Sequence, residues 1–100
     1  MKLKFTERGA NRVRMLDNWW HDNRPEAPEL FKKELEAAKV ELLSNPHLGR
    51  PYKKIRGRLF RKYLLEGCGE WLYYRVLEDE ELIVVHTIWG SLLGSEPEID

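Results

Sequence analysis

Apolar and polar positions follow two different periods in this chain, a helical period in the first half and a strand period in the second. Residues 2–5 alternate lysine with Leu3 and Phe5, which predicts a short first strand with one wet face. From residue 7 to about residue 23, apolar side chains recur every three or four positions: Ala10, Val13, Leu16 and Trp20. This spacing predicts an amphipathic helix, and Thr6 is placed to cap its start.

A second helix is predicted between two breaks that contain proline. The first helix should end before Pro25, because the residue before proline is disfavoured in helical geometry. Pro28 suits the first turn of the next helix, which should end at Ser44-Asn45-Pro46. Its apolar face consists of Phe31, Leu35, Ala38 and Leu42. The short link predicts an antiparallel helical hairpin. Trp19 lies off the apolar stripe beside Trp20, so one of the two should cover an edge or contact a partner.

The period changes to two after residues 46–57, which are rich in glycine, proline and cations and are expected to form a loop. Residues 59–65, 71–77 and 82–89 are rich in β-branched and aromatic residues, and turn-sized segments join them. They predict an antiparallel meander. Residues 91–100 are expected to be a partly loose tail. The predicted fold is α+β in the order β-α-α-β-β-β, with a helical hairpin packed on a mostly antiparallel four-stranded sheet in a single domain of residues 1–100.

Charge is segregated along the chain although its total is zero. The 17 Lys and Arg residues balance 17 Asp and Glu residues, yet residues 50–63 contain no acid. The cations of this stretch are Arg50, Lys53, Lys54, Arg56, Arg58, Arg61 and Lys62. A local positive field of this kind attracts a polyanion or an acidic partner. The alternative is a set of solvated strand and loop positions.

Composition excludes several classes of site. Cys68 is the only cysteine, which excludes an internal disulfide and a multi-cysteine zinc site and suits a reducing cytoplasm. The longest aliphatic run, residues 82–85, is far shorter than the roughly 20 residues of a membrane span, and no signal peptide is expected. His21, His47 and His86 belong to different predicted elements, so no metal site is expected from them. No cofactor-binding motif is found, and we expect no cofactor, no membrane contact and a cytoplasmic location.

His86 is the strongest candidate for acid–base chemistry. It lies in an apolar strand, where a histidine is usually a hydrogen-bonded structural residue. With Arg61 or Lys62 close by, it would supply the acid and the cation that metal-independent RNA cleavage needs. Trp71 and Tyr73 share one face of their strand, where aromatic rings either stack on bases or pack against other strands.

Four segments, in their order along the chain, resemble the RelE/ParE superfamily of bacterial toxins. They are D-N-W-W-H-D-N-R-P-E-A-P-E-L-F at residues 17–31, N-P-H-L-G-R-P-Y at 45–52, L-Y-Y-R-V at 72–76 and I-W-G at 88–90. The resemblance covers residues 2–97 and is closest to the ParE-like, plasmid-stabilisation branch. It implies the toxin of a type II toxin–antitoxin module, neutralised by an antitoxin whose C-terminal segment wraps it. RelE-like members cut messenger RNA in the ribosomal A site, whereas ParE-like members poison DNA gyrase.

The cationic pattern of the RelE-like nucleases is incomplete in this sequence. The first of its two strand lysines falls on Lys62, but the second lysine and two arginines fall on Leu64, Trp71 and Leu92. An apolar side chain cannot offset the charge of a phosphorane. Arg61 matches an arginine of another nuclease branch, but the His-Tyr pair of that branch is missing. The basic tail usual in ParE-like relatives is replaced by S-L-L-G-S at residues 91–95.

The resemblance therefore favours a ParE-like toxin that binds DNA gyrase and forms a hetero-oligomeric complex with its antitoxin. The expected partner-binding residues are Trp19, Trp20, Arg50, Lys53, Lys54, Arg56, Arg58, Trp71 and Tyr73. One alternative is a ribosome-dependent mRNA endoribonuclease that uses Arg61, Lys62 and His86. The other is a weakened or inactive family member retained for antitoxin binding.

Overall fold

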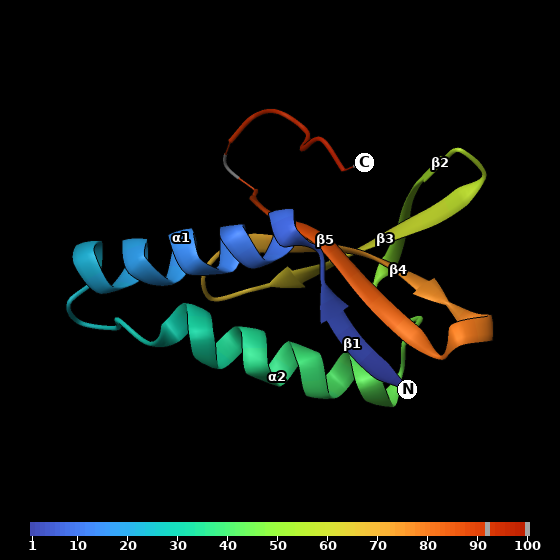
Figure 1. The fold of residues 1–100 in the computed structure, drawn as a ribbon. Helices are drawn as coiled ribbons and strands as arrows, with labels where there is room; N and C mark the ends of the chain where they lie inside the picture. The colour runs from blue at the N-terminus through green and yellow to red at the C-terminus, as the bar shows by residue number, and fades with distance from the viewer. Residues whose placement is uncertain (92, 100) are drawn as a thin grey trace.

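A helical hairpin covers one face of a five-stranded sheet in the computed structural model, which describes residues 1–91 and 93–99 (Figure 1). The elements are β1 (Lys2–Phe5), α1 (Glu7–Asn23), α2 (Leu30–Ser44), β2 (Arg50–Ile55), β3 (Arg58–Leu65), β4 (Glu70–Leu77), a short 3-10 helix (Glu78–Glu80) and β5 (Leu82–Gly90). The strand order is β1-β5-β4-β3-β2, with β1 parallel to β5 and the other neighbours antiparallel. This arrangement confirms the predicted α+β fold, the helical hairpin and the mostly antiparallel sheet.

The sheet has one strand more than the four that were predicted. The expected loop over residues 46–57 is wrong for Arg50–Ile55, which pairs with β3 at the edge of the sheet. Its apolar side chains, Tyr52 and Ile55, are three positions apart, so no alternation marks it as a strand. Backbone pairing at an edge needs no buried face, and lysines and a proline are common there. Arg56 and Gly57 both have positive φ, 54° and 77°, as a two-residue hairpin turn requires.

The main core lies between the helices and the sheet face that they cover, which we call the inner face. Its buried side chains include Leu16, Trp20, Phe31, Leu35, Ala38, Leu42, Leu72, Tyr74, Ile83 and Val85. Both predicted helical stripes therefore face the sheet. Trp20 is 8% exposed and Trp19 is 43% exposed, so Trp19 is the tryptophan that faces outward.

Helix α1 covers the part of the β5 edge that β1 is too short to pair. β1 pairs with β5 only as far as Val85. Beyond that point, Thr6 Oγ1 donates to the His86 carbonyl at 3.0 Å and Arg12 Nε donates to the Ile88 carbonyl at 2.7 Å. Gly9 permits this close approach, since a Cβ there would lie 2.8 Å from the Val85 carbonyl oxygen. Edge carbonyls that lack a strand partner are thus satisfied by helix side chains.

A second, smaller cluster lies on the opposite face of the sheet, which we call the outer face. Phe60 and Tyr73 are buried there together with Ile99, which is 4% exposed. The segment after β5 was expected to be partly loose, whereas Ile99 anchors it on the sheet.

No helix of the described residues is both long and apolar enough to cross a membrane.

Candidate partner-binding surfaces

Strand register brings three predicted partner-binding residues together with Lys62, predicted as catalytic, on the outer face. Arg50 lies opposite Lys62 across β2 and β3, and Lys62 lies opposite Tyr73 across β3 and β4. Residues directly opposite each other in a sheet share a face, and so do residues two apart in one strand, which adds Trp71. Four of the predicted residues therefore form one continuous surface.

Cations and aromatic rings interleave on this surface. Lys62 Nζ lies 4.4 Å from the ring centroid of Trp71 and 5.3 Å from that of Tyr52, and Arg50 Cζ lies 4.9 Å from the Trp71 ring. These are cation–π distances. Burial and the nearby Arg50 charge lower the pKa of Lys62. Tyr52, Lys62, Trp71, Tyr73 and Trp89 border a cavity of about 340 Å³, which we call the aromatic–cation pocket. An incoming carboxylate or phosphate would offset the repulsion between the two cations.

The other predicted basic residues lie on the β2–β3 hairpin, where Lys53 pairs with Phe60 on the outer face and Lys54 points to the opposite side. Lys53, Lys54, Arg56 and Arg58 are exposed. Lys53 Nζ forms an ion pair with Glu96 Oε2 at 2.9 Å. Hydrogen bonding to Glu96 raises the pKa of Lys53, and the same bond lowers the pKa of Glu96.

The predicted catalytic residues do not share one site. Arg61 lies on the inner side of β3, where its Nη1 donates to the Gly49 carbonyl at 2.8 Å and to the His47 carbonyl at 3.4 Å. Lys62, the next residue, lies on the outer face among the aromatic rings. Alternate residues of a strand point to opposite sides, so these two cations cannot act together on one phosphate.

His86 lies on the outer face but already has partners. Arg75 Nε donates to His86 Nε2 at 3.0 Å, and the Phe60 ring lies edge-on at 4.9 Å between centroids. Burial and the Arg75 charge lower the pKa of His86, so its neutral form is favoured. Because Nε2 accepts from Arg75, the proton of the neutral ring is on Nδ1. Sequence reasoning missed Arg75, although the alternation of Trp71, Tyr73 and Arg75 places it on the same face.

Leu64, Trp71 and Leu92 occupy positions that are cations in the RelE-like nucleases, so these three positions supply no positive charge in this chain. Leu64 lies opposite Trp71 across β3 and β4. Trp71 provides a ring for Lys62 and Arg50. Leu92 lies outside the described residues.

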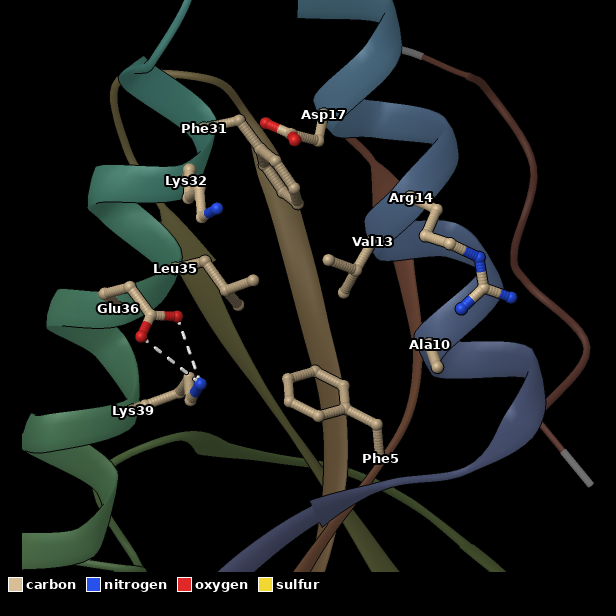
Figure 2. A pocket seen from close by; sticks show the side chains of 10 residues that line it. All are labelled: Phe5, Ala10, Val13, Arg14, Asp17, Phe31, Lys32, Leu35, Glu36 and Lys39. Atoms are coloured by element: carbon tan, nitrogen blue, oxygen red, sulfur yellow. Dashed lines mark hydrogen bonds and ion pairs between the residues drawn. The ribbon is translucent and has the colours of Figure 1, made fainter.

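A second candidate surface is the groove between α1 and α2, with a volume of about 360 Å³ (Figure 2). Figure 2 shows Phe5, Val13, Phe31 and Leu35 directed into the space between the two helices. Charged residues border it: Arg14, Asp17, Lys32, Glu36 and Lys39. Lys39 Nζ pairs with Glu36 Oε2 at 3.0 Å along one side. An apolar floor with a charged border suits one face of an amphipathic helix. The sequence predicted that the apolar residues of the two helices belong to the core, but it did not predict a groove between the helices.

The far end of the hairpin holds the other predicted aromatic pair. Trp19 lies edge-on to Trp20 with centroids 5.8 Å apart, and Arg24 Cζ lies 4.8 Å from the Trp19 ring. Both tryptophans belong to the helical layer, so the predicted partner-binding residues divide between two regions of the molecule.

His21 is brought close to two acids at the same end of the hairpin. Its Nε2 lies 2.6 Å from Glu29 Oε1, and its Nδ1 lies 2.8 Å from the Asp17 carbonyl oxygen. One ligand atom from each of Asp17, His21 and Glu29 lies within 4.8 Å of the others, so these residues are the group in the described chain that could hold a metal ion. From the sequence, His21 was weighed only with the other two histidines. Asp17 lies one helical turn before His21 in α1, and the turn between the helices brings Glu29 to it.

Three solved toxin structures share this fold. The toxin of the chromosomal ParDE system from P. aeruginosa matches with a TM-score of 0.67 and 22% identity, over 90% of this chain and 95% of that one. An E. coli RelE mutant in complex with an antitoxin RelBc peptide matches with a TM-score of 0.63 and 20% identity, over 89% and 81%. The intact E. coli RelBE complex matches with a TM-score of 0.52 and 25% identity, over 89% and 94%. No curated protein matches the sequence.

The chain thus has the fold of these RelE and ParE toxin structures. Residues 3–91 match the profile of the family described as "ParE toxin of type II toxin-antitoxin system, parDE". The chain belongs to this ParE toxin family.

Proposed function

We propose that this toxin inhibits growth by binding DNA gyrase, and that a cognate antitoxin neutralises it. The observation that carries the proposal is the separation of Arg61 from Lys62. Arg61 holds the Gly49 carbonyl on the inner side of β3, whereas Lys62 lies between Trp71 and Tyr52 on the outer face. RNA cleavage needs a cation, a base and an acid converging on one phosphate. A surface of interleaved cations and rings without that convergence suits protein contact.

The antitoxin would contact two surfaces. The groove between α1 and α2 has the apolar floor and charged border that receive an amphipathic helix. The aromatic–cation pocket and the β2–β3 hairpin have the charge to receive an acidic extended segment. An antitoxin that wraps the molecule would reach both. The matched RelE structure in complex with an antitoxin peptide agrees with the existence of such a partner.

A supercoiling assay with purified gyrase tests the proposed target. The toxin should inhibit supercoiling, and equimolar antitoxin should restore it. The variant Lys53→Glu/Lys54→Glu/Arg58→Glu should bind the antitoxin more weakly, because it reverses three exposed charges of the β2–β3 hairpin. A matched control, Lys2→Glu/Lys4→Glu/Lys33→Glu, reverses the same number of exposed positive charges away from that hairpin.

Primer extension on transcripts after induction tests the enzymatic alternative. Codon-specific cuts together with unaffected gyrase would contradict the proposal and favour an endoribonuclease. Normal growth with retained antitoxin binding would favour a weakened member kept for its antitoxin.

The proposal also places the protein in the cytoplasm, as one half of a module that stabilises the plasmid carrying it. A neighbouring reading frame for a DNA-binding protein with an amphipathic tail would agree with this.

A further inference from the structure

The segment after β5 returns to the outer face of the sheet and is held there at four points. Trp89 Nε1 donates to the Ser95 carbonyl at 2.9 Å. Glu96 Oε2 pairs with Lys53 Nζ at 2.9 Å, and the Glu98 carbonyl accepts from Arg8 Nη1 at 2.6 Å. Ile99 is buried against Phe60 and Tyr73. These contacts join the tail to a surface that includes two of the predicted partner-binding residues, Lys53 and Tyr73.

The tail is complementary in charge to the surface beneath it. Residues 95–100 read S-E-P-E-I-D, with three acids and no cation. The face under residues 95–99 contains Arg50, Lys53, Arg58, Lys62 and Arg75, and between those cations lie the rings of Tyr52, Trp71 and Tyr73. The hydrogen bond from Lys53 lowers the pKa of Glu96. The tail thus brings acid to a face that has an excess of positive charge.

One aliphatic side chain anchors this acidic strand. Ile99 is 4% exposed, and Pro97 is also buried. Glu96 and Glu98 remain exposed, so over residues 96–99 exposed acids alternate with buried side chains, as in a strand lying on a surface. The His86 ring, which accepts from Arg75, also hydrogen-bonds the Ile99 backbone. The chain itself therefore displays the type of peptide that this face accepts.

We propose that the outer face is a receptor for an extended acidic peptide with one aliphatic anchor, and that the chain's own tail occupies it as an internal competitor. A partner segment of this chemistry has to displace residues 95–99 before it reaches Lys53, Tyr73 and the rest of the face. The identification of that partner as the antitoxin rests on the proposed function. The occupancy of the face by the tail does not, because it depends only on contacts within this chain.

Competition from a tethered segment is strong because its effective concentration is high. A short flexible connection gives an effective concentration on the order of millimolar. A free peptide should therefore bind the wild-type protein roughly tenfold or more weakly than a protein whose tail has been released. Release without truncation is achieved by Ile99→Asp, since a carboxylate is strongly disfavoured between Phe60 and Tyr73.

The test uses full-length protein and a synthetic peptide of residues 95–100, acetylated at its N-terminus. Binding is followed by the ¹⁵N–¹H signal of the Trp89 indole, whose N–H donates to Ser95 in the closed arrangement. In Ile99→Asp the signal should move to a solvent-exposed position, and the added peptide should return it towards the wild-type position. Wild-type protein should show at least about tenfold weaker binding of the same peptide.

A matched control and a charge swap make the result specific. Leu93→Asp introduces the same change in the same segment at a side chain that is 56% exposed, so it should leave the Trp89 signal unchanged. A peptide with Lys in place of Glu96 should bind poorly to Ile99→Asp and better to the double variant Ile99→Asp/Lys53→Glu. Equal binding of the peptide by wild type and Ile99→Asp would overturn the proposal, as would an unmoved Trp89 signal in a folded Ile99→Asp variant. Neither gyrase nor antitoxin is present, so these results are independent of the proposed function.

Discussion

Arg61 and Lys62 are neighbours in sequence but serve opposite sides of strand β3. Arg61 Nη1 donates to the Gly49 carbonyl at 2.8 Å, whereas Lys62 Nζ lies 4.4 Å from the Trp71 ring centroid on the outer face. One cation therefore holds the loop before β2 and the other shapes a binding surface. Substitutions at the two positions should separate stability from binding.

Arg61→Ala should lower the free energy of unfolding by about 1.5–3 kcal/mol, the usual contribution of hydrogen bonds from a charged donor. Lys62→Ala should change it by less than about 1 kcal/mol, since the Lys62 ammonium contacts aromatic rings and is only half-buried. Urea denaturation measures both. Antitoxin affinity should fall for Lys62→Ala at a temperature where the protein is fully folded. An equal loss of stability in the two variants would contradict the assignment of Arg61 to the loop.

Tyr74→Phe should destabilise the protein by about 1–3 kcal/mol. The Tyr74 hydroxyl accepts from the Gly49 N–H at 2.8 Å and donates to the Pro46 carbonyl at 2.8 Å, and the ring is fully buried. Removing the hydroxyl leaves the Gly49 N–H without its partner. Tyr63→Phe is the control, because it removes an exposed hydrogen bond to Glu41 and should cost less. Comparable losses in denaturation experiments would show that burial of the Tyr74 contacts is not decisive.

The two histidines His21 and His86 should titrate on opposite sides of the ordinary histidine value. The hydrogen bonds of His21 to the Asp17 backbone and the Glu29 side chain raise its pKa, whereas burial and the Arg75 charge lower that of His86. The stabilisation from His21 is fully present below its unfolded pKa and is lost as pH rises through its folded pKa. That from neutral His86 is present above its unfolded pKa and is lost as pH falls through its folded pKa.

NMR titration of the ring protons of His21 and His86 measures both pKa values directly. In Glu29→Gln the pKa of His21 should move back towards about 6.5, while His86 should be unaffected. In Arg75→Gln the pKa of His86 should rise and that of His21 should not change. Coincident titration of the two histidines in the wild type would be incompatible with the contacts described.

Val13→Lys should weaken antitoxin binding by roughly tenfold or more, because an apolar helix face docked in the groove would meet a charge. Val13 is half-buried and lines the groove between α1 and α2. Val40→Lys makes the same change on α2 at a side chain that is 66% exposed and outside the groove, so it should bind normally. Isothermal titration with purified antitoxin provides the comparison. Unchanged affinity in a folded Val13→Lys variant would exclude the groove as a docking site.

Much of the fold could be predicted because its elements carry their own periodicity. The stripe of Leu16 and Trp20 in α1 and that of Phe31 and Leu35 in α2 mark the buried sides of the helices, and both lie on the sheet. β2 could not be predicted in this way. As an edge strand it is held by backbone pairing with β3, and its side chains carry no alternating pattern that marks it as a strand.

The candidate site was only partly predictable for a related reason. The sequence identified the basic stretch and the aromatic residues of β4, but the faces on which they lie depend on register. Arg50, Lys62 and Tyr73 meet because they are opposite one another across three strands. Arg75 and Ile99 were missed, since their contacts with His86, Phe60 and Tyr73 join segments that are distant in sequence.

The sequence by itself therefore determined the order of the elements other than β2, the buried stripes of the helices and the presence of a concentrated positive charge. These properties depend on the spacing of side chains along a single element. Only the tertiary structure decided that Arg61 supports a loop while Lys62 belongs to a binding surface, and that the acidic tail covers this surface. Such outcomes depend on strand register and on long-range pairing between segments.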